Sequence, residues 1–139
     1  MRNHERGSVT LETVIIAPFM ILIVAGIVAA GRIGLAQQAV QTVAYDAARA
    51  ASISRDAGSA RSAAQQVAAL SMASNHLNCA TSNVNISTAG FGSAVGTKAV
   101  VDATIVCTVQ LSDIALPGIP GSLTIEKEAT SPIDQYRER

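Results

Sequence analysis

Charged and aromatic side chains are scarce in this chain, and both shortages limit what the protein can do. Among 139 residues, 14% are charged, 3% are aromatic and tryptophan is missing altogether. Soluble domains carry about a quarter charged residues, so this composition is unusual for one. The formal net charge is zero at pH 7, which leaves no global field to attract nucleic acid or an acidic partner. We therefore expect no nucleic-acid binding.

The apolar residues that are present are mostly small or medium in size. They make up 49% of the chain, and the excess lies in Ala, Val and Ile rather than in large aromatics. Such side chains bury little area each, which predicts a thin core rather than a globule with a deep pocket. We expect no catalytic cleft and no small-molecule substrate.

A long run without any charged side chain lies near the N-terminus. It extends from Thr13 to Gly31 and is closed by Glu12 and Arg32. As a helix that rises about 1.5 Å per residue it would cover roughly 28 Å, close to the ~30 Å hydrocarbon core of a bilayer. The length predicts a transmembrane helix over residues 8–31, in contact with the lipid bilayer.

A cleaved secretory signal is the alternative interpretation of this run. Its apolar region would be about 7–15 residues long, with a small-residue cleavage site after it. Ala25, Ala29 and Ala30 resemble such a site. The run is longer than this, and helix-compatible sequence continues beyond it, so a retained span is favoured.

The orientation follows from the charges that flank the run. Arg2 and Arg6 precede it and favour a cytoplasmic N-terminus, although Arg32 lies on the far side. Cys79 and Cys107 then fall in the extracytoplasmic part, where an even pair of cysteines predicts a disulfide. In the chain-entropy model such a disulfide stabilises the domain by about 3.5 kcal/mol.

The helical pattern continues past the span to about Arg55. Small apolar residues recur there at spacings of three and four: Ile33, Ala36, Val40, Val43, Ala47 and Ala50. This seam can pack on the protein's own C-terminal domain or on neighbouring subunits, and the two are compatible on different faces. Asp56-Ala57-Gly58 then marks a break, and Ser59 can cap a second helix that ends near Ser74. A single helix bent at Gly58 is the alternative.

After Asn75 the apolar residues alternate with polar ones, which is typical of strands. Val84 and Ile86 mark a first strand, and Leu123 and Ile125 mark a last one. The clearest strand lies between them and places these residues on one face: Ala99, Val101, Ala103, Ile105, Cys107, Val109 and Leu111. The pattern predicts a small antiparallel sheet packed against a helix.

Connections between these strands are also visible in the sequence. Turns are expected at Pro117-Gly118 and Pro120-Gly121, and a glycine-rich loop at Gly90–Gly96. Cys107 would face inward from the central strand and bond to Cys79 in the loop that enters the first strand.

The segment Arg6-Gly7-Ser8-Val9-Thr10-Leu11-Glu12 runs directly into the apolar span. A short basic leader ends in Gly, Glu stands at the fifth position after it, and a hydrophobic helix follows, which resembles the type IV prepilin signal. Pro18 inside the span, Gly31-Arg32 at its exit and an alanine-rich stretch at residues 45–51 resemble, more narrowly, the TadE-like family of the tight-adherence (Tad) pilus system. Thr13 stands where major pilins of that system usually carry Tyr, which argues against a major pilin.

The resemblance covers residues 6–51 and implies how the chain is processed and assembled. A prepilin peptidase would cut between Gly7 and Ser8, and Glu12 would pair with the freed N-terminus of a neighbouring pilin-like subunit. Alternatively, Glu12 is an ordinary acidic partner of the helix dipole. Pro18 would kink the helix or melt one turn, which either eases extraction into a packed helix bundle or is harmless.

Residues that could form a metal, phosphate-binding or catalytic site do not occur in the patterns that such sites require. Structural zinc needs four ligands, whereas His76, Cys79 and Cys107 supply three without a Cys-x-x-Cys pair. The loop at Gly90–Gly96 lacks the Lys-Ser/Thr ending of a phosphate-binding loop, and no nucleophile motif is found. We expect no enzyme, no metal and no cofactor.

The sequence thus predicts an α+β protein in which a long N-terminal membrane-spanning helix continues into an amphipathic helix and a small C-terminal antiparallel sheet follows. Its expected parts are a leader (1–7), a transmembrane helix (8–31), an extracytoplasmic helical region (32–74) and a β-rich domain (75–139). The leading hypothesis is a minor pilin-like, non-catalytic component (a pseudopilin) of Tad or type IV-like pilus assembly, single-pass in a bacterial membrane or at the pilus. The alternatives are a permanently tethered extracytoplasmic binding module and a secreted domain that begins near Gly31.

Overall fold

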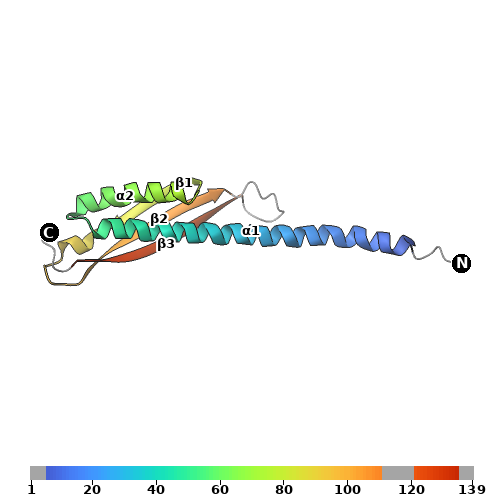
Figure 1. Ribbon diagram of the computed structural model, residues 1–139, viewed down its shortest axis with the longest axis horizontal. Coiled ribbons are helices and arrows are strands. Elements are labelled where there is room, and N and C mark those ends of the chain that lie inside the picture. The colour runs from blue at the N-terminus through green and yellow to red at the C-terminus, as the bar shows by residue number, and fades with distance from the viewer. Residues whose placement is uncertain (1–5, 111–120, 135–139) are drawn as a thin grey trace. The chain divides into compact units, whose positions relative to one another are not determined.

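The structure is a computed structural model that describes the backbone of residues 6–110 and 121–134, and the side chains from residue 12 onward within these ranges. Its elements are α1 (Arg6–Ser52), α2 (Ala57–Ser74), β1 (Cys79–Ser87), the short 3-10 helix η1 (Ala89–Gly92), β2 (Ala99–Gln110) and β3 (Ser122–Ile133) (Figure 1). The fold is therefore α+β, as the sequence predicted.

The chain divides into two compact units, residues 1–34 and residues 35–139. Helix α1 contributes to both of them. In the part of the first unit that the structure describes, the N-terminal portion of α1 is the only element, and residues 1–5 of the predicted leader lie outside the description. The second unit holds the remainder of α1, all of α2 and the three strands.

The strands form an antiparallel sheet in the order β1-β2-β3. Ala103 of the central strand is opposite Ile86 of β1 and Ala129 of β3, so these three side chains share one face. All three are buried, and burial alternates along β2 as the sequence pattern predicted. The turn predicted at Pro117-Gly118 lies outside the described residues.

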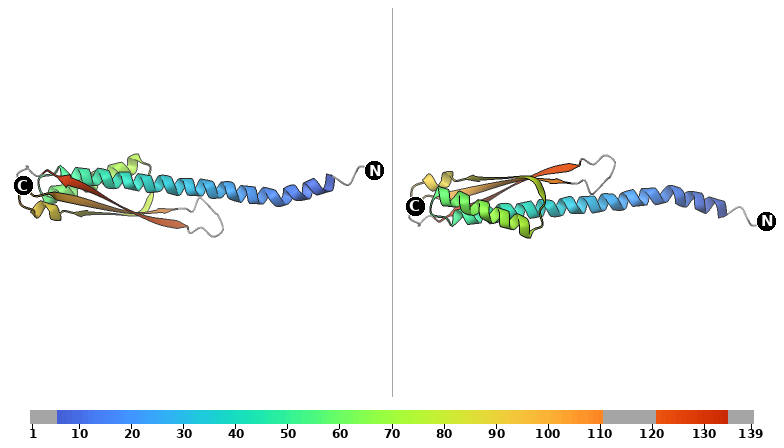
Figure 2. Two further views of the ribbon diagram at one scale, coloured as in Figure 1. Left: turned by 90° about the horizontal axis from the view of Figure 1, so that it is seen from below. Right: turned by 90° about the horizontal axis from the view of Figure 1, so that it is seen from above.

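One face of the sheet is covered by the helices of the second unit. The buried cluster joins α1, α2 and this face of the strands, and Figure 2 shows both helices on the same side of the sheet. Its helical members are Val40, Val43, Ala44, Ala47, Ala48, Ala51, Ala60, Ala64 and Ala68. The largest fully buried side chains of the described residues are one Ile, three Val and one Cys, with no aromatic among them. Small helix residues let the backbones approach the sheet closely, which is why the core is thin.

The predicted seam of small residues is part of this core. Val40, Val43, Ala47 and Ala50 are buried, while Ile33 and Ala36 are half-buried. Gln41 Nε2 also donates to the Glu128 carbonyl oxygen of β3 at 3.1 Å. Packing of the seam on the protein's own domain is therefore confirmed for residues 40–50.

The boundary between the two helices differs from the prediction in its cap. Two separate helices are present rather than one bent helix, but the N-cap of α2 is Asp56 and not Ser59. The Asp56 carboxylate accepts hydrogen bonds from the backbone amides of Gly58 (2.9 Å) and Ser59 (2.8 Å). Ser59 completes a capping box from the third helical position instead. The Asp56 carboxylate accepts hydrogen bonds from two backbone amides that have no partner within the helix. The Ser59 hydroxyl does not cap these amides.

The glycine-rich loop contains η1 and approaches the sheet at Gly90. A Cβ atom at residue 90 would collide with the Val100 carbonyl oxygen, so only glycine fits there. Thr88, just before η1, is buried, and its hydroxyl accepts a hydrogen bond from Arg61 Nη2 of α2 at 2.8 Å. The loop is thus an ordered connection that α2 holds in place.

Candidate functional site: the N-terminal helix and the β3 groove

The first unit presents large apolar side chains on every side of α1. Eleven large apolar residues between positions 14 and 28 have side chains that are 48% to 69% exposed: Val14, Ile15, Ile16, Phe19, Met20, Ile21, Leu22, Ile23, Val24, Ile27 and Val28. A helix that is apolar all round is either buried in a large core or embedded in a membrane. By length and composition α1 can cross a membrane, and only 6% of its apolar window is buried by the rest of the chain. The first unit therefore fits a membrane anchor.

Glu12 lies at the edge of this apolar segment with its side chain exposed. Because α1 begins at Arg6, Glu12 is beyond the first turn of the helix, which contains no acidic residue. The attraction between an acid and the helix dipole falls off within that first turn. The dipole alone therefore gives a weak account of an ionisable residue at this position.

Pro18 lies within α1, which remains helical on both sides of it. The melted turn considered from the sequence is thus absent from the described helix (Figure 1). Proline has no amide hydrogen, so the carbonyl oxygen of Val14, four residues earlier, loses its helical donor. Neighbouring helices or side chains can satisfy such a group inside a membrane.

Glycines follow at the end of the apolar segment. Gly26, Gly31 and Gly34 have no heavy atom within 4 Å of the position that a Cβ would occupy. The surface at these residues is open, and glycine at such positions allows another helix to approach closely.

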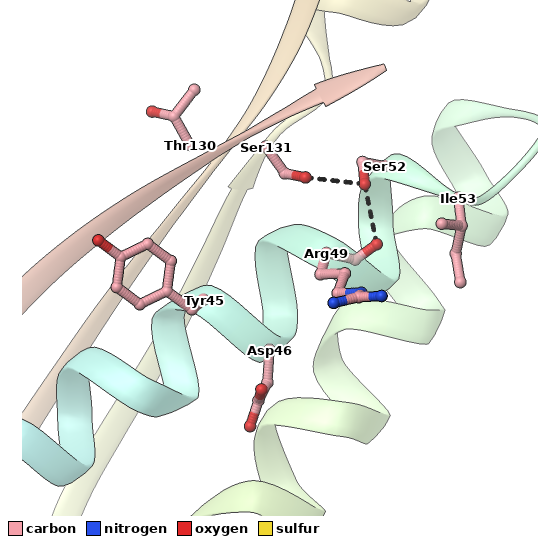
Figure 3. A pocket seen from close by; sticks show the side chains of 7 residues that line it. All are labelled: Tyr45, Asp46, Arg49, Ser52, Ile53, Thr130 and Ser131. Atoms are coloured by element: carbon pink, nitrogen blue, oxygen red, sulfur yellow. Dashed lines mark hydrogen bonds between the residues drawn. The ribbon is translucent and has the colours of Figure 1, made fainter. Parts of the chain in front are cut away.

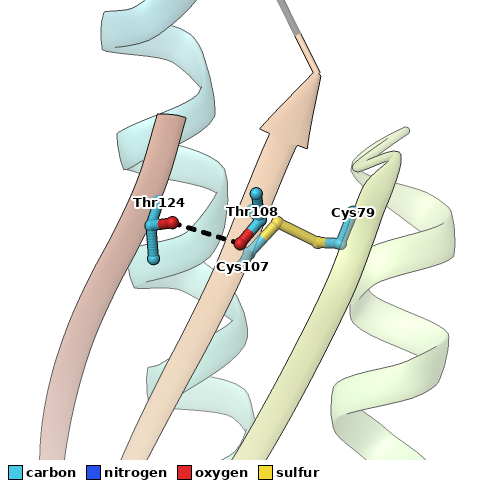
Figure 4. The surroundings of a disulfide bond; sticks show 4 residues. All are labelled: Cys79, Cys107, Thr108 and Thr124. Carbon is cyan, nitrogen blue, oxygen red and sulfur yellow. Dashed lines mark hydrogen bonds between the residues drawn. A yellow bond between two sulfur atoms is a disulfide. The ribbon is translucent and has the colours of Figure 1, made fainter. Parts of the chain in front are cut away.

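The two cysteines form a disulfide in the second unit (Figure 4). Cys79 is the first residue of β1 rather than part of the preceding loop, so that detail of the prediction was wrong. Cys79 is opposite Val109, and the pairing then shifts between Cys79 and Thr81, which leaves Ala80 as a bulge. The Cα atoms of the two cysteines are 5.4 Å apart, within the range that a disulfide requires.

His76 has a structural role at the end of α2. It adopts a positive φ of 52°, and its amide donates to the Ala73 carbonyl oxygen at 3.1 Å. The amide of Leu77 donates to Met72 at 3.0 Å, which completes a Schellman motif. The described residues contain no cluster of metal-ligating side chains.

A groove that the sequence did not predict lies where α1 meets β3. Its volume is about 460 Å³, and it is lined by Tyr45, Asp46, Arg49, Ser52, Ile53, Thr130 and Ser131 (Figure 3). Ser131 Oγ donates to Ser52 Oγ at 2.9 Å, and Ser52 Oγ donates to the Arg49 carbonyl oxygen at 2.9 Å. The bond between Ser131 and Ser52 joins β3 to the last turn of α1.

The groove escaped prediction because its two walls are far apart in the chain. Tyr45 and Arg49 lie in the alanine-rich stretch that carried the family resemblance, but Thr130 and Ser131 lie in a strand whose end was not recognised. The sequence does contain a pattern that indicates the full length of β3: apolar residues continue at alternate positions to Ala129 and Ile133, which are buried. Pro132 is unusual in a strand, although proline is tolerated in an edge strand such as β3.

Comparison with known families identifies the N-terminal segment. The model of the TadE-like protein family matches residues 7–49. The match covers Glu12, Pro18 and Arg49 and ends before α2 and the sheet. No curated protein matches the chain, and neither does any solved structure.

Proposed function

We propose that this chain is a minor pilin-like subunit, a pseudopilin, of a Tad or type IV-like pilus assembly, because the TadE-like family model matches residues 7–49. In this role the protein is non-catalytic and assembles through its N-terminal helix. The observation that carries the proposal is a helix with a TadE-like sequence whose large apolar side chains are exposed around Glu12 and Pro18.

Membrane insertion is the first step of the proposed role. The apolar part of α1 crosses the bilayer once, with the N-terminus in the cytoplasm because Arg2 and Arg6 precede the span. Residues 35–139 then lie outside, in the oxidising compartment that the disulfide between Cys79 and Cys107 requires. The bilayer also provides the apolar surroundings that the exposed side chains of α1 lack within the chain.

Processing by a prepilin peptidase follows in this proposal. Cleavage between Gly7 and Ser8 removes the basic leader and frees the amine of Ser8 close to the start of the span. Glu12 of one subunit then pairs with this amine of a neighbour. An acid at mid-helix costs about 2.5–3.5 kcal/mol to insert on translocon scales, and less near the interface, so a pairing partner lowers the cost of keeping Glu12 next to lipid.

Pro18 and the glycines have roles in the same step. The Val14 carbonyl oxygen left without a donor by Pro18 is available to a neighbouring helix. Gly26, Gly31 and Gly34 leave open surface where such a helix can approach. Both features favour transfer of α1 from lipid into a bundle of pilin-like helices.

The mature N-terminus tests the proposal directly. The protein is purified from membranes of its own host, and the mass of its N-terminal peptide is measured. A chain that begins at Ser8 supports prepilin processing. A chain that retains the leader contradicts it and favours the permanently tethered binding module, and a start near Gly31 favours a secreted domain.

A further inference from the structure

A contact at the β3 edge of the sheet shows in which direction the backbone groups of each strand point. Gln41 Nε2 of α1 donates to the Glu128 carbonyl oxygen at 3.1 Å, so this carbonyl points away from β2. In an antiparallel pair, opposite residues either exchange both backbone hydrogen bonds or exchange none. Glu128 is opposite Thr104, so the backbone groups of Thr104 point to β1. The carbonyl oxygen of Val100, which has the same parity in β2, lies against Gly90 just after β1 and agrees with this direction.

The same alternation determines which backbone groups of β1 lie at the outer edge of the sheet. Asn85 is opposite Thr104, so it exchanges backbone hydrogen bonds with β2. Its neighbours Val84 and Ile86 therefore direct their N–H and C=O groups away from β2, and Ser82 has the same parity. No strand of the described sheet lies beyond β1. Within the described part of the chain these outward groups form no hydrogen bond.

The two edges of the sheet differ in how they are protected. At the β3 edge Gln41 bonds to one carbonyl group, Pro132 has no N–H, and residues 126–128 are all charged. Charged residues and proline are the means by which proteins prevent an edge strand from pairing with another chain. Strand β1 has neither in its 9 residues, and most of them are exposed. Its bulge at Ala80 is next to the start of the strand and leaves residues 81–87 in regular pairing, so this edge is open to a further strand.

The side chains of β1 indicate what kind of strand fits beside it. Asn83, Asn85 and Ser87 are exposed on the face that the helices leave uncovered, and they are polar without charge. On the other face Val84 packs against the core but is only partly buried. Side chains on neighbouring strands interact in pairs across the sheet. The fitting occupant is therefore an extended, uncharged segment in which apolar and polar residues alternate.

A second copy of this chain does not fit the β1 edge. Its own β3 edge is bonded to α1 and interrupted by Pro132. Antiparallel pairing of two β1 strands, the more stable arrangement, would reverse one copy. Gln41 bonds to Glu128 and, further along both elements, residue 52 bonds to residue 131, so β3 runs in the same direction as α1. Strand β1 runs the same way, because β1 and β3 are both antiparallel to β2. The two α1 helices would thus point in opposite directions, unlike copies anchored by α1 in one bilayer.

We propose that the β1 edge is a strand-addition site, at which an extended, uncharged segment of a different protein joins the sheet beside residues 81–87. Main-chain hydrogen bonds to the outward groups of Ser82, Val84 and Ile86 provide the affinity, and alternate side chains provide the specificity. This inference rests on the proposed function only in that the chain is held in a membrane where the partner is present. It requires neither cleavage after Gly7 nor pairing of Glu12.

Amide hydrogen exchange of the full-length protein tests the proposal. Residue-resolved mass spectrometry measures exchange in membranes of the protein's own host and again after purification in detergent. The amides of Ser82, Val84 and Ile86 are expected to exchange at least about tenfold more slowly in the membranes, because an added strand bonds to them there. The Glu126 amide points outward from the β3 edge by the same alternation and is the internal control, so its exchange should be equal in the two samples. Equal exchange of the three β1 amides, or the same slowing at Glu126, overturns the proposal.

Two proline variants add a second measurement. Val84→Pro removes one outward amide from the β1 edge and is expected to abolish the slowing at Ser82 and Ile86. Glu126→Pro is the matched change at the β3 edge and is expected to leave that slowing intact. Neither substitution removes a hydrogen bond within the sheet, because both amides point away from β2, and thermal unfolding checks that both variants are folded.

Two further outcomes would also overturn the proposal. One is slowing that persists in folded Val84→Pro protein. The other is slowing that increases with the concentration of the purified protein alone, which would assign the β1 edge to a second copy. Exchange in the unaltered protein gives its answer whether or not a variant folds. The mature N-terminus is measured separately, so failure of the proposed function and failure of this inference are distinguishable.

Discussion

Helix α1 passes from a segment whose large apolar side chains are exposed to a segment with one buried face, without a break in its backbone. Between Val14 and Val28 its large residues are apolar, and the chain itself covers few of them. From Val40 onward a stripe of small residues faces the sheet, and exposed positions such as Thr42 and Arg49 are polar. The same helix therefore serves two environments, and the size and spacing of its apolar residues distinguish them.

The largest effect is expected from Glu12→Ala, which tests whether the first half of α1 is made for assembly. The variant should be inserted and processed normally, but its recovery in assembled material should fall at least about tenfold, because a paired charge in an apolar setting is lost. The measurement compares the amount of protein in assembled and membrane fractions. Glu126→Ala is the control, since it removes the same side chain from the sheet. Normal assembly of the Glu12→Ala chain would remove the role proposed for this residue.

Loss of the disulfide should affect only the second half. Replacing Cys79 and Cys107 together by serine should lower the free energy of unfolding of residues 35–139 by about 3.5 kcal/mol, because the unfolded chain is no longer cross-linked. Urea unfolding of the full chain in detergent, followed by circular dichroism, measures this change. Insertion of α1 into membranes should be unaltered. An unchanged unfolding midpoint would mean that the sheet does not depend on the cross-link.

Two equal substitutions on the one helix compare its halves directly. Ala47→Leu adds bulk at a side chain that is 0% exposed and should cost about 1–3 kcal/mol of domain stability through overpacking. Ala17→Leu makes the same change at an exposed position and should leave domain stability unaltered. Thermal unfolding of both full-length variants provides the measurement. Equal effects of the two substitutions would contradict the division of α1 into a lipid-facing part and a packed part.

The smallest effect concerns the cap between α1 and α2. Hydrogen bonds from the backbone and side chain of Ser59 lower the pKa of Asp56 below its ordinary value of 3.8. The ionised carboxylate is the form that caps, so its contribution is complete above that ordinary value and is lost as the pH falls through the lower folded-state pKa. The stability difference between the unaltered chain and Asp56→Asn should therefore shrink below about pH 3.8. Thermal unfolding of both proteins between pH 2 and pH 7 checks this, and a difference that is constant with pH would contradict it.

The apolar helix and the family resemblance of the N-terminal segment could be predicted from local sequence features. The charge-free run, the acid at its start and the proline within it are local features, and the match to the TadE-like family over residues 7–49 confirms the resemblance they suggested. The strand from Ala99 was equally plain, because alternation over its full length permits one face to be buried and the other not. Cleavage between Gly7 and Ser8 and the pairing of Glu12 remain predictions, since they concern other molecules.

Other features depended on contacts that the sequence pattern does not contain. Asp56 and Ser59 are both good capping residues, and only the backbone conformation at Asp56 decides between them. Cys79 was predicted to lie in the loop before the first strand, whereas β1 extends to Cys79 and accommodates Ala80 as a bulge. The left-handed conformation of His76 at the end of α2 could not be foreseen from the sequence pattern.

The sequence by itself determined where α1 is apolar, which residues of β2 face inward and, with two cysteines in the chain, which disulfide forms. These properties follow from the fixed period of a helix or strand and from pair counting. Only the tertiary structure decided that β3 lies along the last turns of α1 and that a groove opens between them. Such contacts join segments about 80 residues apart, and packing of the whole domain rather than local backbone geometry selects them.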